Sequence, residues 1–311
     1  MTRLSIAIPS KGRLMEKSEQ WLSASGFKLR QKGGGRGYSA ELEGLGDVDV
    51  MLLSAREIAT GLIEGQIHLG ITGEDLLNDL SASPEADFEV LHRLGFGGAD
   101  VIVAVPAAWL DVETMADLEA AGALFRERHG RRMRVATKYL SLTRRFFAER
   151  AVGEYRLVES AGATEAAPAA GSAEVIVDIT STGATLKANG LKILRDGVIL
   201  KSQAALTTSL KAEWSETALA PLRELLDGVA ATARATTLAR LELSHPVSEA
   251  EMTALGLNSL NERTALCPSP MAREAARHLA SIGAGSVAIT TVSQVFDPEN
   301  EVFEKFVKQV S

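Results

Sequence analysis

The sequence predicts an α/β protein with a doubly wound, mainly parallel sheet. Short apolar runs alternate with helical patterns along most of the 311 residues, which is typical of βαβ units. Several runs end in small or polar residues before the next helix begins, as strands do beside a ligand crevice. Hydrophobic residues make up 46% of the chain and charged residues 23%, so two or three domains can each bury a core.

The first part of the chain is expected to contain repeated strand–helix units. Each apolar run is followed by a segment with apolar residues at helical spacing. No strand is expected directly before the glycine-rich residues 31–37 and no Lys-Ser/Thr pair follows them, so they are expected to form a mobile connection. The expected strands cover residues 4–8, 48–53, 68–71, 88–94 and 101–105.

The middle of the chain continues this alternation, and the last part is read as a third α/β segment. A long helix is expected over 213–233, before that segment begins. The last part predicts the order βαβαβα, with a closing helix over 299–310. The other expected elements are helices over 111–122 and up to 150 and strands over 135–136, 155–159, 175–177, 192–194 and 198–207.

Residues 174–191 suggest a site for a sugar phosphate. A buried strand ends at Asp178, and a hydroxyl-rich loop around Gly183 leads into a helix that the pattern starts near Leu186. Free amides at a helix start favour an anion, and glycine lets the backbone approach it. Asp178 can accept hydrogen bonds from ribose hydroxyls. An ordinary helix start capped by hydroxyls has the same pattern, so the residues alone leave both readings open.

A basic turn follows the first expected strand. Ser10, Lys11, Gly12 and Arg13 place two cations around a glycine, where strand ends of an open α/β sheet meet the ligand crevice. A solvated basic turn is the alternative, but it leaves the glycine between the two long cations unexplained. The turn is therefore predicted to contact a phosphate group.

Composition excludes several classes of protein. The net charge of −7 makes general nucleic-acid binding an unfavourable reading. The single cysteine, Cys267, rules out a disulfide within the chain and favours a reducing cytoplasm. We expect neither a signal peptide nor a membrane span. The five histidines do not show the spacing of metal ligands, and Walker A and dinucleotide fingerprints are missing.

Several stretches, taken in order, resemble the ATP phosphoribosyltransferase family over about two-thirds of the chain. Because they are independent segments in the same order, they carry more weight together than any one of them. They are IAIPSKGRL at 6–14, the Arg56-Glu57 helix start, HLGITGEDLL at 68–77, RLGFGGADVIVAVP at 93–106, RVATKYL at 134–140, ATEAAPAAGSA at 163–173 and DITSTGATLKANGL at 178–191.

The resemblance implies a two-lobed catalytic part like that of type II periplasmic binding proteins, with the active site between the lobes. Lobe I would comprise residues 1–103 and 192–233, lobe II residues 104–191, and a C-terminal domain residues 234–311. The implied reaction joins N1 of the adenine of ATP to C1 of 5-phosphoribosyl 1-pyrophosphate and releases pyrophosphate. It would need Mg²⁺, carried on the pyrophosphate without a dedicated set of protein ligands.

The resemblance also implies roles for individual residues. Lys11 and Arg13 would stabilise the charge that develops on the leaving pyrophosphate, and Glu165 matches a family acid near the reacting centre. Ser54 stands where many relatives carry a second arginine, and Lys138 is a candidate replacement for that cation. The expected substrate-binding residues are Ser10, Gly12, Arg56, Gly73, Glu74, Thr137, Asp178, Thr180, Ser181, Thr182, Gly183, Ala184 and Thr185.

The C-terminal segment is similar to the family's long form mainly in its length. The long form carries a ferredoxin-like domain that binds histidine as feedback inhibitor, whereas the short form depends on a separate regulatory subunit. We expect residues 234–311 to regulate or assemble the protein, as a homo-oligomer in the cytoplasm. Two rival readings remain: a two-lobed binding protein for a small molecule, and a silent regulatory subunit.

Overall fold

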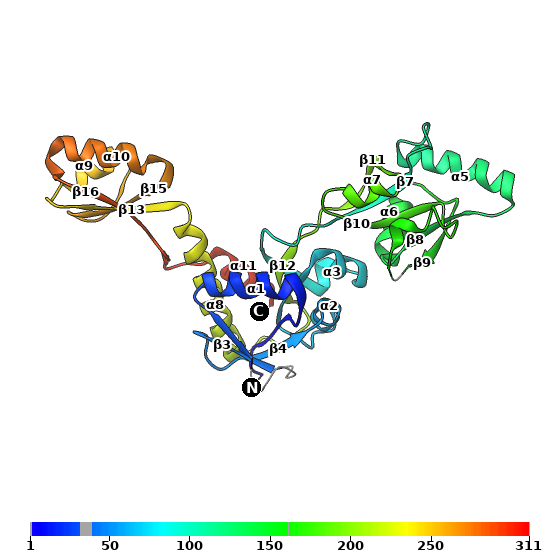
Figure 1. The fold of residues 1–311 in the computed structure, drawn as a ribbon. Coiled ribbons are helices and arrows are strands. Elements are labelled where there is room, and N and C mark those ends of the chain that lie inside the picture. The colour runs from blue at the N-terminus through cyan, green and yellow to red at the C-terminus, as the bar shows by residue number, and fades with distance from the viewer. Residues whose placement is uncertain (1, 32–38, 161, 311) are drawn as a thin grey trace.

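Three sheet-containing regions form an open V in the computed structural model, which describes residues 2–31, 39–160 and 162–310. Figure 1 shows the first lobe at the base of the V, with the second lobe and the C-terminal domain rising on opposite sides. The expected glycine-rich connection at 31–37 lies almost entirely outside the described residues. Among the described residues, no helix is both long and apolar enough to span a membrane.

The first lobe is a seven-stranded sheet in the order β2-β3-β4-β1-β5-β12-β6. β1 is parallel to β4 and β5, while β12 is antiparallel to β5 and β6. The sheet is therefore parallel only at its centre. The strands are β1 (Ser5–Pro9), β2 (Lys28–Gln31), β3 (Ser39–Glu43), β4 (Asp49–Leu53), β5 (Leu69–Gly73), β6 (Phe88–Arg93) and β12 (Ala204–Ser209).

Local sequence signals explain where several helices of this lobe begin and end. α2 starts at a reciprocal capping box between Ser54 and Glu57 and stops at Gly65, which is in the left-handed conformation. α1 starts within the basic turn, at Gly12, with Lys11 at its N-cap. The helices are α1 (Gly12–Ala24), α2 (Ala55–Glu64), α3 (Glu74–Leu80), α4 (Pro84–Asp87) and α8 (Glu216–Ala235).

The second lobe contains a five-stranded sheet in the order β11-β7-β10-β8-β9. Its buried centre is formed by apolar strands such as β10, where Val175, Ile176 and Val177 are fully buried. The elements are β7 (Asp100–Pro106), α5 (Met115–His129), β8 (Met133–Thr137), α6 (Leu140–Glu149), β9 (Tyr155–Glu159), the short 3-10 turn η1 (Thr164–Ala166), β10 (Val175–Thr180), α7 (Ala184–Ala188) and β11 (Leu191–Leu200).

The chain passes between the lobes twice, at residues 94–99 and 201–203. These crossing segments bond to each other: the amide of Ala99 donates to the carbonyl of Ser202 over 2.9 Å. The expected single strand over 198–207 is wrong, because the apolar run is interrupted at the crossing. The lobe boundaries expected at 103 and 191 differ from this division, since β7 and β11 both lie wholly in the second sheet.

The C-terminal domain has a four-stranded antiparallel sheet in the order β14-β15-β13-β16. The element order βαββαβ with this strand order is ferredoxin-like. The expected order βαβαβα is wrong because β14, with the polar sequence NSLN, lacks an apolar run. The elements are β13 (Leu238–Leu243), α9 (Glu249–Ala254), β14 (Asn258–Asn261), β15 (Thr264–Pro268), α10 (Ala272–Leu279) and β16 (Val287–Thr291).

The last helix, α11 (Glu301–Val310), returns to the first lobe. Phe303 and Phe306 are buried in the same apolar cluster as Leu222 and Leu225 of α8. In Figure 1 this helix lies beside α8 and away from the ferredoxin-like sheet. Residues 234–311 are therefore not one packing unit, because their final turns complete the core of the first lobe.

Candidate functional site

The hydroxyl-rich loop of the second lobe joins β10 to α7. Gly183 has φ +71°, a conformation that a residue with a Cβ adopts only with strain. The amide of Gly183 donates to the hydroxyl of Thr180 over 2.9 Å, and the hydroxyl of Ser181 donates to the carbonyl of Gly98 over 2.8 Å. The hydroxyls thus hold the loop in shape and tie it to the first crossing segment.

A cavity of about 320 Å³ opens beside this loop. The structure brings Glu165, thirteen positions upstream of Asp178, to the same cavity, so that two carboxylates and several hydroxyls face one space. Two of the predicted loop residues, Gly183 and Ala184, do not line it. The lining residues are Ala99, Glu165, Asp178, Ile179, Thr180, Ser181, Thr182, Thr185 and Leu186.

Asp178 is a partly desolvated carboxyl in this cavity. Burial raises the pKa of its carboxyl above the ordinary value, because the charged form loses water. The amide of Ile179 and the charge of Lys138 oppose that rise in the pKa, and the nearby charge of Glu165 adds to it. Lys138 also lies 4.9 Å from the centre of the Tyr139 ring. The cavity therefore combines a poorly solvated carboxyl with one neighbouring cation.

The basic turn lies at the carboxyl edge of the first sheet. β1 is parallel to its neighbours β4 and β5, so the turns that follow these three strands lie on one edge. The amide of Ser10 donates to the carbonyl of Leu53 over 2.8 Å. Lys11 and Arg13 are exposed, and Gly12 has φ +72° with open space where a side chain would be. The sequence alone predicted that this turn follows the first strand, at the edge where the strand ends meet.

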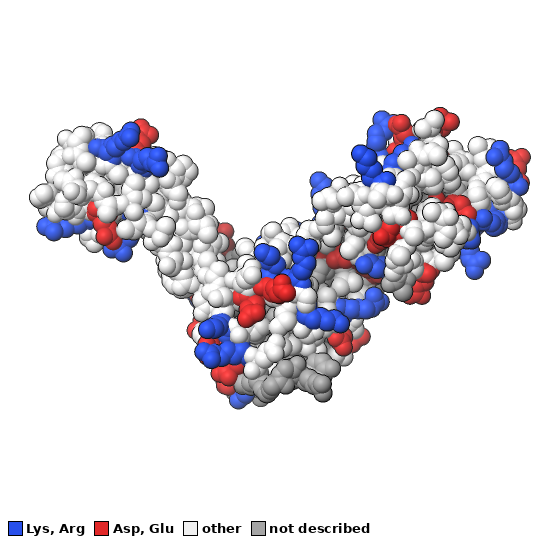
Figure 2. Space-filling model, in the orientation of Figure 1, with Lys and Arg blue, Asp and Glu red and all other residues white. Residues whose placement is uncertain are grey.

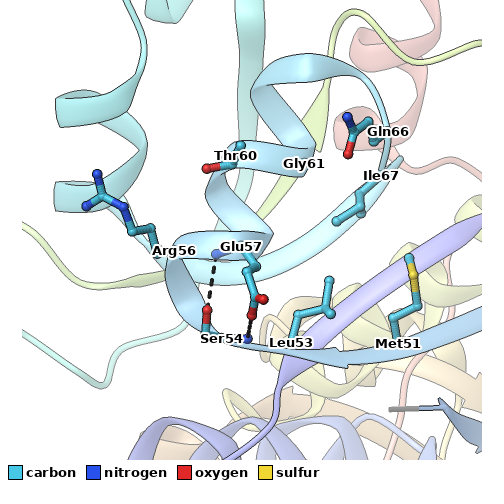
Figure 3. A pocket seen from close by; sticks show the side chains of 9 residues that line it. All are labelled: Met51, Leu53, Ser54, Arg56, Glu57, Thr60, Gly61, Gln66 and Ile67. Carbon is cyan, nitrogen blue, oxygen red and sulfur yellow. Dashed lines mark hydrogen bonds between the residues drawn. The ribbon is translucent and has the colours of Figure 1, made fainter.

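Arg56 borders a different hollow, of about 570 Å³, between α2 and β4. Figure 3 shows its side chain directed away from Met51 and Leu53, which form part of the apolar wall. Ser54, where a second arginine was expected, serves as the N-cap of α2 in the box with Glu57 (Figure 3). The structure does not bring Arg56 into the cavity of the loop.

Gly73 and Glu74 lie at the end of β5, beside the second crossing segment. A Cβ at Gly73 would come within 2.2 Å of the carboxylate of Asp75, so a side chain at this position would have to displace that carboxylate. Glu74 is only 4% exposed and pairs with Arg93 over 2.9 Å. Its second carboxylate oxygen has no hydrogen-bond partner among the described residues. Both predicted residues thus face the hinge between the lobes.

Thr137 is fully buried, and its hydroxyl accepts a hydrogen bond from the amide of Tyr139 over 2.9 Å. Its side chain therefore helps to form the turn before α6. The prediction missed Asp75, which lies beside Glu74 in the ITGED stretch. Asp75 accepts a hydrogen bond from the hydroxyl of Tyr139 over 2.6 Å, across the two lobes. Its position directly after a strand end was the signal that could have found it.

Charges on the face shown in Figure 2 are mixed. Basic and acidic side chains alternate over both lobes, and the arm towards the C-terminal domain is largely uncharged in this view. The cations of the first lobe therefore do not belong to an extended basic surface on this face.

Taken together, the two lobes, the paired crossing segments and the strand-end turns define a two-lobed α/β protein of the periplasmic-binding-protein-like class. A model of the family described as "HisG: ATP phosphoribosyltransferase" matches residues 54–228. The chain belongs to this family.

Relatives along the whole length agree with that assignment. An ATP phosphoribosyltransferase from Caulobacter vibrioides (strain NA1000 / CB15N) is 50% identical over 310 residues, which cover 98% of this chain and 97% of that protein. One from Rhodopseudomonas palustris (strain BisB18) is 47% identical over 316 residues, with the same coverage. Both matches extend through the C-terminal domain, where the short motifs of the sequence had given little resemblance.

Among solved structures, the "ATP phosphoribosyl transferase (HisG:HisZ) complex from Thermotoga maritima" is similar in fold. The TM-score is 0.55 at 24% identity, and the match covers 73% of this chain and 98% of that chain. At this identity the likeness supports the two-lobed fold.

Proposed function

We propose that this chain catalyses the first step of histidine biosynthesis, the transfer of the phosphoribosyl group of 5-phosphoribosyl 1-pyrophosphate to N1 of the adenine of ATP. Family membership along nearly the whole chain supports the reaction. The observation that supports its location is the cavity beside residues 178–185, where Asp178, Glu165 and four hydroxyl-bearing residues of that stretch face one space. Ribose hydroxyls need acceptors and a phosphate needs donors, and this lining offers both.

In this proposal, the loop holds the sugar while the cations of the first lobe act on its leaving group. Asp178 orients the ribose hydroxyls, and the hydroxyls of Thr182 and Thr185 donate to the 5-phosphate. Lys11 and Arg13 stabilise the negative charge that grows on pyrophosphate as it departs. Holding N1 of the adenine in line with C1 lowers the barrier, because the two reactants no longer have to find this geometry by chance. Glu165 either orients a sugar hydroxyl or accepts a proton.

Mg²⁺ fits this site as a cation carried by the substrate. The described residues contain no group of three or more His, Cys, Asp or Glu side chains that could hold a metal ion, whereas Asp178 and Glu165 give the cavity oxygen donors. Mg²⁺ prefers such donors and often binds through one or two carboxylates plus substrate phosphates. When bound, it would neutralise charge on the pyrophosphate.

An assay of the purified chain alone tests the proposal. The chain is supplied with ATP, the pyrophosphorylated sugar and Mg²⁺, and the absorbance of the adduct is followed. We expect the adduct to form with no partner protein added. Asp178→Ala combined with Thr185→Ala should abolish it while the circular dichroism spectrum stays unchanged. Full activity of that double variant would contradict the location of the sugar site.

The ferredoxin-like domain, in this proposal, binds histidine as feedback inhibitor and supports assembly into a homo-oligomer. A simple truncation after Ala233 would also remove Phe303 and Phe306 from the core of the first lobe. Excision of residues 238–291 with a short linker spares them. We expect the excised enzyme to remain active and to lose inhibition by histidine. Inhibition of the excised enzyme at the histidine concentration that inhibits the full-length enzyme would contradict this role. If the full-length chain needs an added subunit for activity, a separate regulator is favoured.

A further inference from the structure

Two helices from different lobes cap each other. The carboxylate of Asp79, on α3 of the first lobe, accepts hydrogen bonds from the amides of Ser141 and Leu142 at the start of α6, both over 3.0 Å. In return, Arg145 of α6 donates to the carbonyl of Ser81 over 2.8 Å and to that of Asn78 at the end of α3. We call this set of contacts the α3–α6 dock.

The dock satisfies backbone groups that neither helix can satisfy alone. The first amides and last carbonyls of a helix have no partner inside it. Tyr139, the N-cap of α6, offers no side-chain hydrogen bond to the helix start, so the amides depend on Asp79 of the other lobe. Asp79 is 6% exposed, and hydrogen bonds that involve a charged group are stronger than neutral ones. The hydroxyl of Tyr139 adds its bond to Asp75 beside the dock.

The dock is also an attachment between the lobes that is separate from the chain crossings. Residues 94–99 and 201–203 belong to no strand or helix, and short segments of this kind can act as hinges between lobes. The dock adds a third attachment, in which charged side chains of one lobe bind the helix ends of the other. It therefore restricts the lobes to fewer relative orientations. The restriction matters because the sugar loop follows β10 in the second lobe, whereas Lys11 and Arg13 follow β1 in the first.

We propose that Asp79 and Arg145 are positioning residues for phosphoribosyl transfer, which act by fixing the second lobe's sugar loop relative to the first lobe's cations. The inference rests on the proposed roles of that loop and of the basic turn. Neither residue lies in the loop or its cavity. A misplacement of about 1 Å can slow a reaction about 100-fold even when the altered residue lies far from the chemistry.

The first test separates turnover from sugar binding. Asp79→Asn and Arg145→Met should each lower kcat by about 10-fold to 100-fold. The dissociation constant of ribose 5-phosphate, which contacts the second lobe alone, should change by less than about twofold. Arg145→Lys keeps a charged donor for one carbonyl and should restore part of the rate. Arg144→Met is the matched control, because Arg144 is exposed on the same helix and has no hydrogen bond or ion pair among the described residues.

A second test measures the lobes directly and does not depend on activity. Spin labels are placed at Lys28→Cys in the first lobe and Arg128→Cys in the second, in a Cys267→Ser background, and the distribution of distances between them is recorded. We expect Asp79→Asn and Arg145→Met to broaden the distribution and Arg144→Met to leave it unchanged.

The outcomes separate the dock from the function on which it rests. An inactive parent enzyme would contradict the proposed reaction, and unchanged ribose 5-phosphate binding in Asp178→Ala would contradict the sugar site. If the reaction and the sugar site are both confirmed, two results overturn the inference. One is a dock variant whose kcat per folded molecule equals that of the parent, and the other is a distance distribution that does not broaden. A loss confined to thermal stability would assign the dock a purely structural role and also overturn it.

Discussion

The two halves of the candidate site differ in how firmly the protein holds them. In the second lobe, hydrogen bonds from Gly183 and Ser181 fix the sugar loop before any ligand arrives. In the first lobe, Lys11 and Arg13 are exposed and have no hydrogen-bond or ion-pair partner among the described residues. One half of the candidate site is therefore preformed, and in the proposed reaction the ligand would order the other. This division suits the proposed reaction, in which the phosphoribosyl group stays bound while pyrophosphate departs and gains negative charge.

Removing the cations should give the largest effect. We expect Lys11→Met combined with Arg13→Met to lower kcat/KM about 10³-fold, because removing one donor to a developing charge costs about 10²–10³-fold. Ribose 5-phosphate should bind as it does to the parent, measured by calorimetry. Lys17→Met, on an exposed turn of the same helix, is the control. An equal loss of ribose 5-phosphate affinity would mean that the two halves are not separate.

A strained loop should weaken binding by a smaller factor. Gly183→Ala meets open space, so the cost comes from its positive φ, about 1 kcal/mol for a residue with a Cβ. We expect affinity for ribose 5-phosphate to fall about fivefold. Gly171→Ala carries similar strain at φ +66° outside the loop, and should reduce thermal stability while leaving the affinity unchanged. Equal affinity losses in both variants would point to general destabilisation.

The pH profile should report the buried carboxyl of the preformed half. In its proposed role Asp178 acts as an ionised carboxylate, the form whose oxygens all accept from ribose hydroxyls, and burial raises its pKa. Activity should therefore fail, as pH falls, at a higher pH than an ordinary aspartate would impose. Glu165→Gln removes a like charge and should move this acid limb of kcat/KM to lower pH. Lys138→Met removes a nearby positive charge and should move the acid limb to higher pH. If the parent and both variants lose activity at the same pH, the acid limb does not report the carboxyl of Asp178.

The smallest effect on catalysis is expected far from both halves, at Glu174. Burial opposes its ionisation, but hydrogen bonds from Arg131 and Arg134 outweigh that and lower its pKa to about 2. Because this pKa is depressed, the resulting stability is present above the unfolded value of 4.5 and is lost as pH falls towards 2. Glu174→Gln should lower the free energy of unfolding by about 2 kcal/mol at pH 7 and by less at pH 3, with kcat unchanged. A constant difference between the two pH values would contradict this account.

Local patterns predicted the strands that carry the site and the turns that follow them. The apolar run of β10 predicts a buried strand, and the glycine at 183 permits the left-handed conformation found there. Local patterns missed β14, because its residues are polar and its pairing with β15 supplies the strand. They also extended one strand across residues 201–203, because hydrophobicity does not mark the point where a chain moves to another sheet.

By itself, the sequence determined the chemistry available to this protein: a loop of hydroxyls after an acid, a pair of cations around a glycine, and the strand–helix alternation that places them. These features depend on neighbours in the chain, whose geometry is fixed by covalent structure and backbone sterics. Only the tertiary structure decided that Glu165 shares a cavity with Asp178, that Asp79 caps a helix of the other lobe and that Phe306 returns to the first lobe. Such contacts join residues far apart in the chain, and packing selects them only when the whole fold forms.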